Sequence, residues 1–150
     1  MTRILMVCLG NICRSPLAEG ILKSKVDSSQ VFVDSAGTAG YHIGSLPDIR
    51  SIEVAKKHGI NINDQTCRKF TVEDFDNFDV IYAMDQSNYH NILMKARNDE
   101  DESKVMMILN ESEPSSNRSV PDPYYGGDDG FENVFQMLDE ACDVIANKIS

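Results

Sequence analysis

Four short apolar runs alternate with stretches in which apolar residues recur at helical spacing. The runs cover residues 4–9, 31–33, 80–84 and 105–109, and the helical periodicity lies in residues 17–22, 49–55, 89–96 and 131–149. Strands that alternate with helices predict a parallel sheet that is covered on both faces. We therefore expect an α/β fold, whose ligands bind at the carboxyl ends of the strands near a topological switch.

Local patterns predict further details of these elements. Ile49, Ile52 and Ala55 form the apolar stripe of the second helix, and His58 with Gly59 marks its expected end. Two polar, turn-rich stretches, residues 98–104 and 110–119, are interpreted as solvated surface loops. Neither flank of these loops is long enough to be a separate domain, so we expect residues 1–150 to form a single domain.

The composition of the chain indicates in which compartment the protein is expected and which classes of partner are unlikely. The chain has no apolar run of about 18 residues, so no membrane span is expected, and residues 1–10 are interpreted as a strand rather than a signal peptide. Four cysteines in 150 residues do not indicate a disulfide scaffold, which favours a cytoplasmic protein. A formal net charge of −10 argues against nonspecific binding to nucleic acid or membranes. We expect a monomer.

The segment VCLGNICRSP connects the first expected strand to the first expected helix. Ser15 suits an N-cap and Pro16 suits a first turn, so the helix is expected to begin at one of them. Gly10 and Asn11 readily accept positive φ, which lets successive backbone N–H groups point into one concavity. Such a loop at a helix N-terminus binds anions, and Arg14 adds a fork that matches two phosphate oxygens.

The same donors would act on the thiol of Cys8. A thiolate held by N–H groups beside an arginine is stabilised, so we expect its pKa to fall below the free value of about 8.5. Cys8 is then a nucleophile aimed at the phosphorus of a bound phosphate ester, and Ser15 donates a hydrogen bond to its sulfur. The alternative is that Cys8 is a buried strand residue and Arg14 a surface charge. The C-x5-R-S spacing favours the chemical interpretation.

Residues 120–127 read VPDPYYGG and are interpreted as a stiff loop that presents a carboxyl group. Asp122 lies between Pro121 and Pro123, which together restrict the backbone and favour extended geometry. A carboxylic acid placed in this way can protonate the leaving oxygen of a phosphate ester. Tyr124 and Tyr125 would provide an aromatic wall for a flat leaving group. Taken alone, the segment is better interpreted as an ordinary proline turn with two half-buried tyrosines, and only its pairing with the Cys8 segment favours the acid.

Taken together, these segments resemble the low-molecular-weight protein tyrosine phosphatases over essentially the full chain. The shared motifs are VCLGNICRSPLAEG, DSAGT, LPDIR, HGI, DFDNFDVIYAMDQSN and VPDPYYGG, in this order. The resemblance implies a four-stranded parallel sheet flanked by helices on both faces, with a phosphate-binding loop after the first strand. It also implies that Cys8 is the nucleophile, that Arg14 clasps the phosphate and that Asp122 is the general acid.

The resemblance extends to the residues around the phosphate. It implies that Asn11 holds a left-handed conformation through a network that includes Ser35, and that Tyr41 lines the entrance with Tyr124. The implied phosphate- and substrate-binding residues are Leu9, Gly10, Asn11, Ile12, Cys13, Ser15, Tyr41, Tyr124 and Tyr125. Many relatives have a histidine near the position of Gln65. Glutamine also donates and accepts hydrogen bonds, so we expect the loop shape to be retained.

The expected reaction is hydrolysis of phosphotyrosine in two steps through a cysteinyl-phosphate. The expected partners are phosphotyrosine-containing proteins, with phosphate or other oxyanions as inhibitors. No cofactor is expected, and no metal, because His42, His58 and His90 show no ligand spacing with the cysteines.

The other cysteines call for separate interpretations. Cys13 shares the loop with Cys8, and the family precedent favours a redox role in which its thiol traps an oxidised Cys8. The alternative is that Cys13 is a small packing residue beneath the loop. Cys67, near a turn, and Cys142, on the apolar stripe of the last helix, are interpreted as structural.

Two rival functions remain open. A thioredoxin-coupled arsenate reductase of the same fold needs two further cysteines that relay a disulfide, and Cys67 and Cys142 lie far apart in the sequence. A noncatalytic phosphopeptide-binding module would keep Arg14 and the loop but would need neither Cys8 nor Asp122. The presence of both residues favours an enzyme.

Overall fold

The computed structural model describes residues 1–149, apart from the side chains of Tyr125 and Asp128. Its strands are β1 (Thr2–Cys8), β2 (Val31–Gly37), β3 (Val80–Ala83) and β4 (Val105–Met107). Its α-helices are α1 (Arg14–Lys23), α2 (Ile49–Lys57), α3 (Asp74–Asn77), α4 (Gln86–Leu93), α5 (Asp99–Ser103), α6 (Leu109–Ser112) and α7 (Gly130–Ile149). Two 3₁₀ turns, η1 (Pro123–Tyr125) and η2 (Gly127–Asp129), precede α7.

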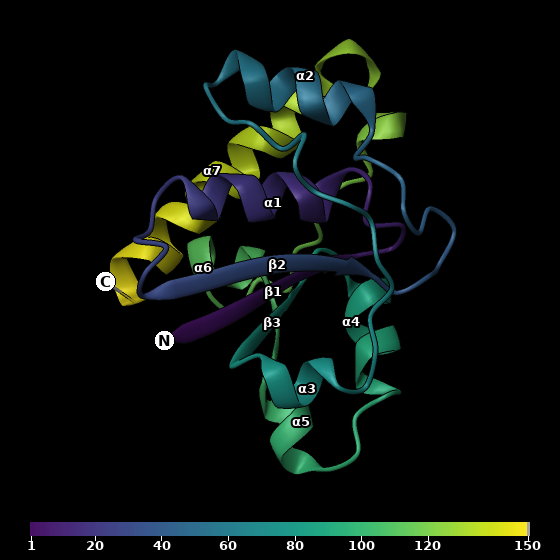
Figure 1. Ribbon diagram of the computed structural model, residues 1–150, viewed down its shortest axis with the longest axis vertical. Coiled ribbons are helices and arrows are strands. Elements are labelled where there is room, and N and C mark those ends of the chain that lie inside the picture. The colour runs from purple at the N-terminus through teal and green to yellow at the C-terminus, as the bar shows by residue number, and fades with distance from the viewer. Residues whose placement is uncertain (150) are drawn as a thin grey trace.

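The sheet has the strand order β2-β1-β3-β4, and every pairing is parallel. Helices α1, α2 and α7 lie on one side of the sheet, and α3, α4 and α5 lie on the other (Figure 1). The expected four-stranded parallel sheet with helices on both faces is therefore confirmed. Within residues 1–149, none of the helices combines the length and apolar character needed to span a membrane.

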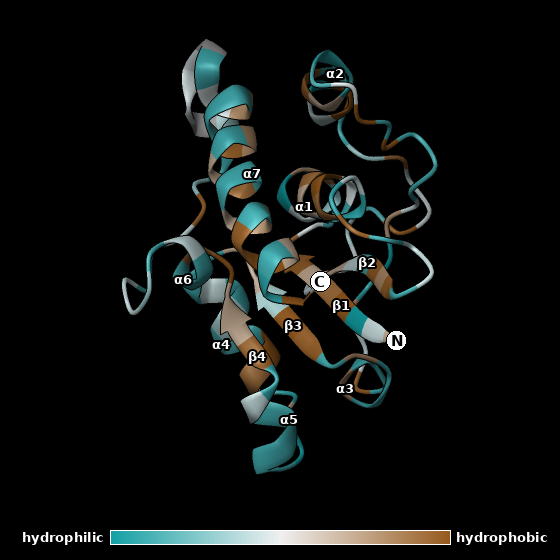
Figure 2. Ribbon diagram, turned by 90° about the vertical axis from the view of Figure 1, so that its left-hand side faces the viewer, coloured by the Kyte–Doolittle hydropathy of each residue, from teal (hydrophilic) through white to brown (hydrophobic). Residues whose placement is uncertain are grey.

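The central strand β1 joins the two halves of the core. Ile4 and Met6 belong to the apolar cluster that includes α1 and α7, whereas Leu5 and Val7 belong to the cluster beneath α3 and α4. This alternation follows from the period of two along a strand, and it explains why the run is continuously apolar. Figure 2 shows the brown, apolar strands enclosed between helices with teal outer sides.

Two segments expected to be surface loops contain helices. Residues 98–104 include α5, whose N-cap Asn98 accepts the backbone N–H of Asp101 at 2.9 Å. Its acidic residues fill the first turn, where carboxylates interact favourably with the helix dipole. Likewise, α6 occupies the start of residues 110–119. Both helices are too short to show apolar periodicity; the Asn98 cap marks α5, whereas α6 has no side-chain cap.

The apolar stripe expected for α2 is wrong in part. Ile49 is 64% exposed, and the residues that α2 buries are Ser51, Val54 and Ala55. Asp48 caps the helix by accepting the backbone N–H of Arg50 at 2.8 Å, and this cap fixes the direction in which α2 leaves the preceding loop. Periodicity alone did not distinguish Val54 from Ile49 as the inward residue.

Candidate active site

The segment from Cys8 to Arg14, here called the Cys8 loop, joins the end of β1 to the start of α1. Strand β1 lies between β2 and β3, so the loop is at the point where the strand order reverses. Helix α1 begins at Arg14, one residue before the expected boundary, and Cys13 is its N-cap without a side-chain cap bond. Pro16 lies in the first turn, as expected.

The carbonyl groups of the Cys8 loop are turned outward by donors from surrounding segments. The backbone N–H groups of Thr38 and Ala39 donate to the carbonyls of Cys8 and Leu9, both at 2.9 Å. Asp48 N–H donates to the Ile12 carbonyl at 2.7 Å. Within residues 1–149, by contrast, no protein acceptor engages the N–H groups of residues 9–13. The loop therefore combines engaged carbonyls with unpaired N–H donors, which is the pattern expected of an anion-binding nest.

Two residues make this tight curvature possible. Asn11 has φ 58°, in the left-handed region that asparagine tolerates better than most residues. Gly37, at the end of β2, lies against the loop backbone, and a Cβ there would be 2.8 Å from the Leu9 carbonyl oxygen. The loop therefore requires a glycine on the neighbouring strand, which the sequence analysis did not identify.

A hydrogen-bond network beneath the loop ends at the sulfur of Cys8. Ser15 Oγ lies 3.0 Å from Cys8 Sγ, and Asn11 Nδ2 donates to Ser15 Oγ at 2.8 Å. Asn11 Nδ2 also donates to Ser35 Oγ at 3.0 Å, and Asn11 Oδ1 accepts the backbone N–H of Arg68 at 3.0 Å. The structure thus brings together the nucleophile candidate and the expected supporting residues Asn11, Ser15 and Ser35.

Arg14 is 6% exposed and is held from one side only. Its Nη1 atom donates to Asp85 Oδ2 at 2.8 Å and to the Val120 carbonyl at 2.9 Å. Asp85 is itself fixed as the N-cap of α4. Because both contacts use Nη1, the other guanidinium donors have no acceptor among the described residues and are available to a bound anion.

The cavity above the Cys8 loop has a volume of about 270 Å³. Its lining combines loop residues with side chains from two other segments: Cys8, Leu9, Gly10, Ile12, Cys13, Arg14, Tyr41, His42, Asp122 and Tyr124. The segment of residues 120–127, here called the Asp122 loop, contributes its carboxyl group to this cavity. Asp122 Oδ1 accepts the Tyr124 N–H at 3.0 Å, which leaves Oδ2 as the oxygen that can carry a proton.

Tyr124 forms one side of the cavity entrance and is held in place by neighbours on α2. Its hydroxyl donates to Asp48 Oδ2 at 2.6 Å, and the Arg50 guanidinium lies 4.3 Å from its ring centroid. The bond to Asp48 is the main reason that the pKa of Tyr124 is raised. Tyr41 also lines the cavity and is 74% exposed. The side chain of Tyr125, expected to join the aromatic wall, lies outside the described part of the chain.

The other cysteines have different surroundings. Cys13 lines the cavity, and burial together with the charge of Asp48 raises its pKa to about 12. Cys67 is buried, and its thiol donates to the Asn11 carbonyl at 2.8 Å, so it supports the Cys8 loop. Cys142 is fully buried among the apolar residues of α7, and burial raises its pKa. None of the four cysteines forms a disulfide.

Gln65 does not join the network around Asn11. Its Nε2 donates to the Pro16 carbonyl at 3.0 Å, and its Oε1 is buried without a partner among the described residues. Asn11 nevertheless keeps its left-handed backbone. Gln65 therefore contacts the first turn of α1 rather than Asn11.

Several residues near the site were missed by the sequence analysis. Asp85 anchors Arg14, Gly37 allows the close approach of β2, and His42 lines the cavity. Glu19 accepts a hydrogen bond from Ser35 at 2.6 Å. Of these residues, only Asp85 could have been predicted from the sequence. It is a polar residue soon after a buried strand, and such residues lie at the ligand-binding edge of a parallel sheet.

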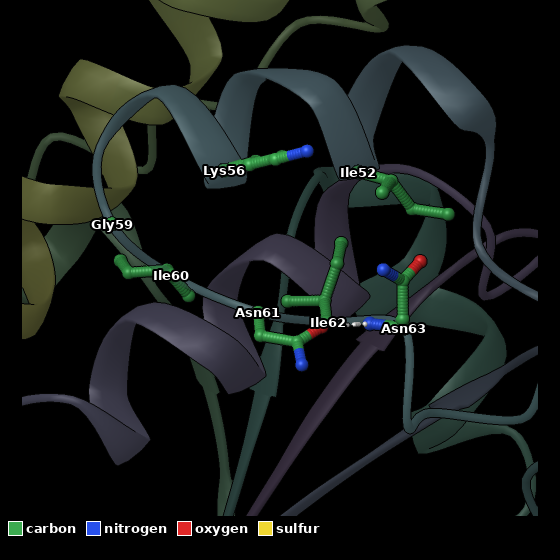
Figure 3. Close-up of a pocket in the computed structure, with 7 residues that line it drawn as sticks. All are labelled: Ile52, Lys56, Gly59, Ile60, Asn61, Ile62 and Asn63. Carbon is green, nitrogen blue, oxygen red and sulfur yellow. Dashed lines mark hydrogen bonds between the residues drawn. The ribbon is translucent and has the colours of Figure 1, made fainter.

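A second cavity, of about 350 Å³, lies between α2 and the segment after it (Figure 3). Ile52 and Lys56 come from α2, and the remaining lining residues are Gly59, Ile60, Asn61, Ile62 and Asn63. It shares no lining residue with the cavity above Cys8, and Lys56 is its only charged group. The residues that line this cavity include no nucleophile and no acid, unlike those of the cavity above Cys8.

Comparison with known proteins identifies the relatives of this chain. The profile of the family described as low molecular weight phosphotyrosine protein phosphatase matches residues 3–150. A Schizosaccharomyces pombe protein of that name is 42% identical over 141 residues, which cover 91% of this chain and 89% of the relative. A protein tyrosine phosphatase from Entamoeba histolytica, crystallised with Hepes in the active site, superposes with a TM-score of 0.91 at 37% identity and covers 99% of this chain and 96% of that one. Vibrio vulnificus Wzb in complex with benzylphosphonate gives 0.85 at 29% identity, with 98% of each chain covered.

Proposed function

The chain belongs to the low molecular weight phosphotyrosine protein phosphatase family, and from this premise we propose that it hydrolyses phosphotyrosine in proteins and small aryl phosphates. The observation that carries the proposal is the Cys8 loop, whose free N–H groups and Arg14 surround the space in front of a sulfur atom. The benzylphosphonate complex of the Vibrio relative supports an aryl group beside the anion. Phosphate and other oxyanions are the expected inhibitors.

In the first step the Cys8 thiolate attacks phosphorus. The S–P bond forms as the bond from phosphorus to the leaving oxygen breaks, and the proton on Asp122 Oδ2 moves to that oxygen. The free donors of residues 9–13 and of Arg14 contact the equatorial oxygens. They are fixed before the substrate binds, so they stabilise the charge of the transition state without reorganising.

In the second step water attacks the cysteinyl-phosphate. Asp122, now a carboxylate, takes a proton from the water as its oxygen bonds to phosphorus and the S–P bond breaks. Inorganic phosphate is released, Asp122 regains its proton, and the sulfur leaves as a thiolate. Ser15 lies 3.0 Å from this sulfur and donates a hydrogen bond to the departing charge.

Rapid mixing with p-nitrophenyl phosphate tests the covalent mechanism. We expect a burst of nitrophenol equal to the enzyme concentration, followed by slower steady-state turnover. Cys8→Ser should abolish turnover, whereas the matched control Cys142→Ser, buried in α7, should retain it. Full turnover by Cys8→Ser would exclude the mechanism. Arsenate reduction that depends on thioredoxin would indicate the reductase instead, and binding without hydrolysis by the unmodified protein would indicate a phosphopeptide-binding module.

We also propose that Cys13 protects Cys8 from oxidation. Peroxide oxidises the Cys8 sulfur to a sulfenic acid, the Cys13 sulfur then attacks it, and hydroxide leaves as the disulfide forms. Because the pKa of Cys13 is about 12, its thiolate fraction is small at pH 7 and rises about tenfold with each pH unit. Disulfide closure should accelerate to the same extent. A Cys13→Ala variant that recovers its activity with a dithiol as completely as the unmodified protein would refute this role.

A further inference from the structure

The network beneath the Cys8 loop does not end at Ser35. Ser35 Oγ donates to Glu19 Oε1 at 2.6 Å, and Glu19, on α1, is 3% exposed. Its other oxygen accepts a bond from Lys23 Nζ at 2.6 Å. A continuous chain of side chains therefore runs from a buried carboxylate to the sulfur of Cys8.

The two ends of this chain have fixed hydrogen-bonding roles. At one end the backbone N–H of Arg68 can only donate, which forces Asn11 Oδ1 to accept and directs Asn11 Nδ2 at both serines. At the other end an ionised Glu19 can only accept, so the Ser35 proton points to it. Ser35 is then left as an acceptor for Asn11.

These fixed roles determine which atom donates in each hydrogen bond between Arg68 and Glu19. Ser15 already accepts a proton from Asn11, so its own hydroxyl proton is free to point at Cys8 Sγ, 3.0 Å away. We propose that Glu19 is a positioning residue: by accepting the Ser35 proton it keeps Ser35 an acceptor for Asn11 Nδ2, which supports the orientation of Asn11 fixed by Arg68 and so keeps Ser15 a donor to the sulfur. The inference rests on the proposed function, because a donor to this sulfur assists the departure of thiolate from the cysteinyl-phosphate.

The surroundings of Glu19 fit this role. Burial raises its pKa, and the bonds from Lys23 and Ser35 oppose that effect by favouring the ionised form. One further charged side chain acts on Glu19: Asp34, whose charge opposes ionisation. A purely structural salt bridge would not require Glu19 to face the site, since Lys23 lies one turn along the same helix.

The variant Glu19→Gln tests the inference. The ammonium group of Lys23 can only donate hydrogen bonds, as can the NH₂ group of an amide. The new side chain therefore turns its amide oxygen toward Lys23. The NH₂ group of the new side chain then points at Ser35, whose proton loses its acceptor and competes with Asn11 Nδ2. We expect kcat for p-nitrophenyl phosphate to fall about tenfold and kcat/KM to fall less than about threefold, because the second step is the one that slows. Acid-quench mass spectrometry should find more phosphorylated Cys8 at steady state.

The decisive experiment removes Lys23, the salt-bridge partner of residue 19, and asks whether activity returns. In Glu19→Gln combined with Lys23→Met, the amide is free to turn its oxygen to Ser35, and kcat should return to within about threefold of the unmodified protein. Lys23→Met alone keeps an oxygen of Glu19 facing Ser35 but removes a bond that favours its ionised form, so it should lower kcat by less than Glu19→Gln does. The matched control is Asp101→Asn, which removes another buried carboxylate that is paired with Arg97 and has no link to the network. It should lower stability without separating kcat from kcat/KM.

Unchanged kcat in Glu19→Gln, or no recovery in the double variant, would overturn the inference. If Glu19→Gln does not fold, Ser35→Ala interrupts the same chain and must give the same fall in kcat with little change in kcat/KM. If the unmodified protein shows neither a burst nor phosphorylated Cys8, the proposed function itself fails. If the unmodified protein shows the burst but Glu19→Gln has normal kcat, only the role of Glu19 is refuted and the proposed function stands.

Discussion

The Cys8 loop and the Asp122 loop meet at one cavity but are held in opposite ways. Asn11 and Ser15 are at most 1% exposed, and N–H donors from the segment between β2 and α2 bind the loop carbonyls. Asp122 is exposed, and Tyr124 is 45% exposed. Pro121 and Pro123, and the bonds made by Asp122 and Tyr124, are what orient the second loop.

The difference corresponds to the two tasks. Donors that stabilise a transition state are effective when they are fixed in advance, which requires burial and many supporting bonds. A general acid must meet leaving groups of different shape in the first step and water in the second, so it belongs at an accessible edge. Changes in the Cys8 loop should therefore affect activity and folding together, and changes in the Asp122 loop should affect activity alone.

The largest effect is expected for Arg14→Lys. Lysine keeps the charge near Asp85 but cannot offer two parallel donors to a phosphate, so kcat/KM for p-nitrophenyl phosphate should fall about a thousandfold. The control is Arg97→Lys, at an ion pair with Asp76 and Asp101 outside the site, which should stay within about twofold. A loss below about tenfold for Arg14→Lys would mean that the loop N–H groups carry most of the phosphate binding.

Asp122→Asn should cost about a hundredfold in kcat/KM for substrates with poor leaving groups, and far less for p-nitrophenyl phosphate. Because the residue is exposed, the free energy of unfolding in urea should change by less than about 0.5 kcal/mol. Asp129→Asn, an exposed neighbour just before α7, serves as the control and should change neither quantity. Equal losses for all leaving groups would contradict the role of Asp122 as an acid.

The contrast between the loops also explains what the sequence can predict. Cys8, Arg14 and Asp122 were identified because local spacing, proline positions and family motifs mark them. Their placement around one cavity follows from the parallel sheet, since the Cys8 loop follows β1 at its carboxyl end. Local sequence was therefore sufficient to identify the candidate residues that line this cavity.

The supporting residues could not be found in this way. Glu19 reads as an ordinary helix residue in a salt bridge with Lys23, and only the approach of β2 brings Ser35 to it. A glycine is needed at position 37 because the Leu9 carbonyl approaches closely, and this approach can be seen only in the tertiary structure. The orientation of α2 was likewise decided by packing of Val54 rather than by its periodicity.

Gly37→Ala tests how closely the Cys8 loop depends on its neighbour. The new Cβ would lie 2.8 Å from the Leu9 carbonyl oxygen and 3.0 Å from Asn11 N, both backbone atoms that cannot swing aside. We expect the free energy of unfolding to fall by about 1–3 kcal/mol and kcat/KM to fall about tenfold. Gly40→Ala is the control, because the nearest atoms to its Cβ belong to the side chains of Ile43 and Lys69 rather than to the backbone. Loss of stability with normal kcat/KM would show that the loop adjusts without changing its donors.

The smallest effect is expected at Tyr124, whose ring is oriented by an exposed hydrogen bond. Tyr124→Phe removes the bond to Asp48 but keeps the ring beneath Arg50, so KM for p-nitrophenyl phosphate should rise about threefold with kcat unchanged. Because Asp48 raises the pKa of Tyr124, the hydroxyl keeps its proton and this bond persists well above neutral pH. The ratio of the two KM values should therefore stay constant between about pH 6 and pH 9. Tyr89→Phe, on α4, is the control and should leave KM unchanged. A ratio that falls toward one as the pH rises through this range would mean that the hydroxyl ionises there, and that Asp48 does not hold the aromatic wall in place.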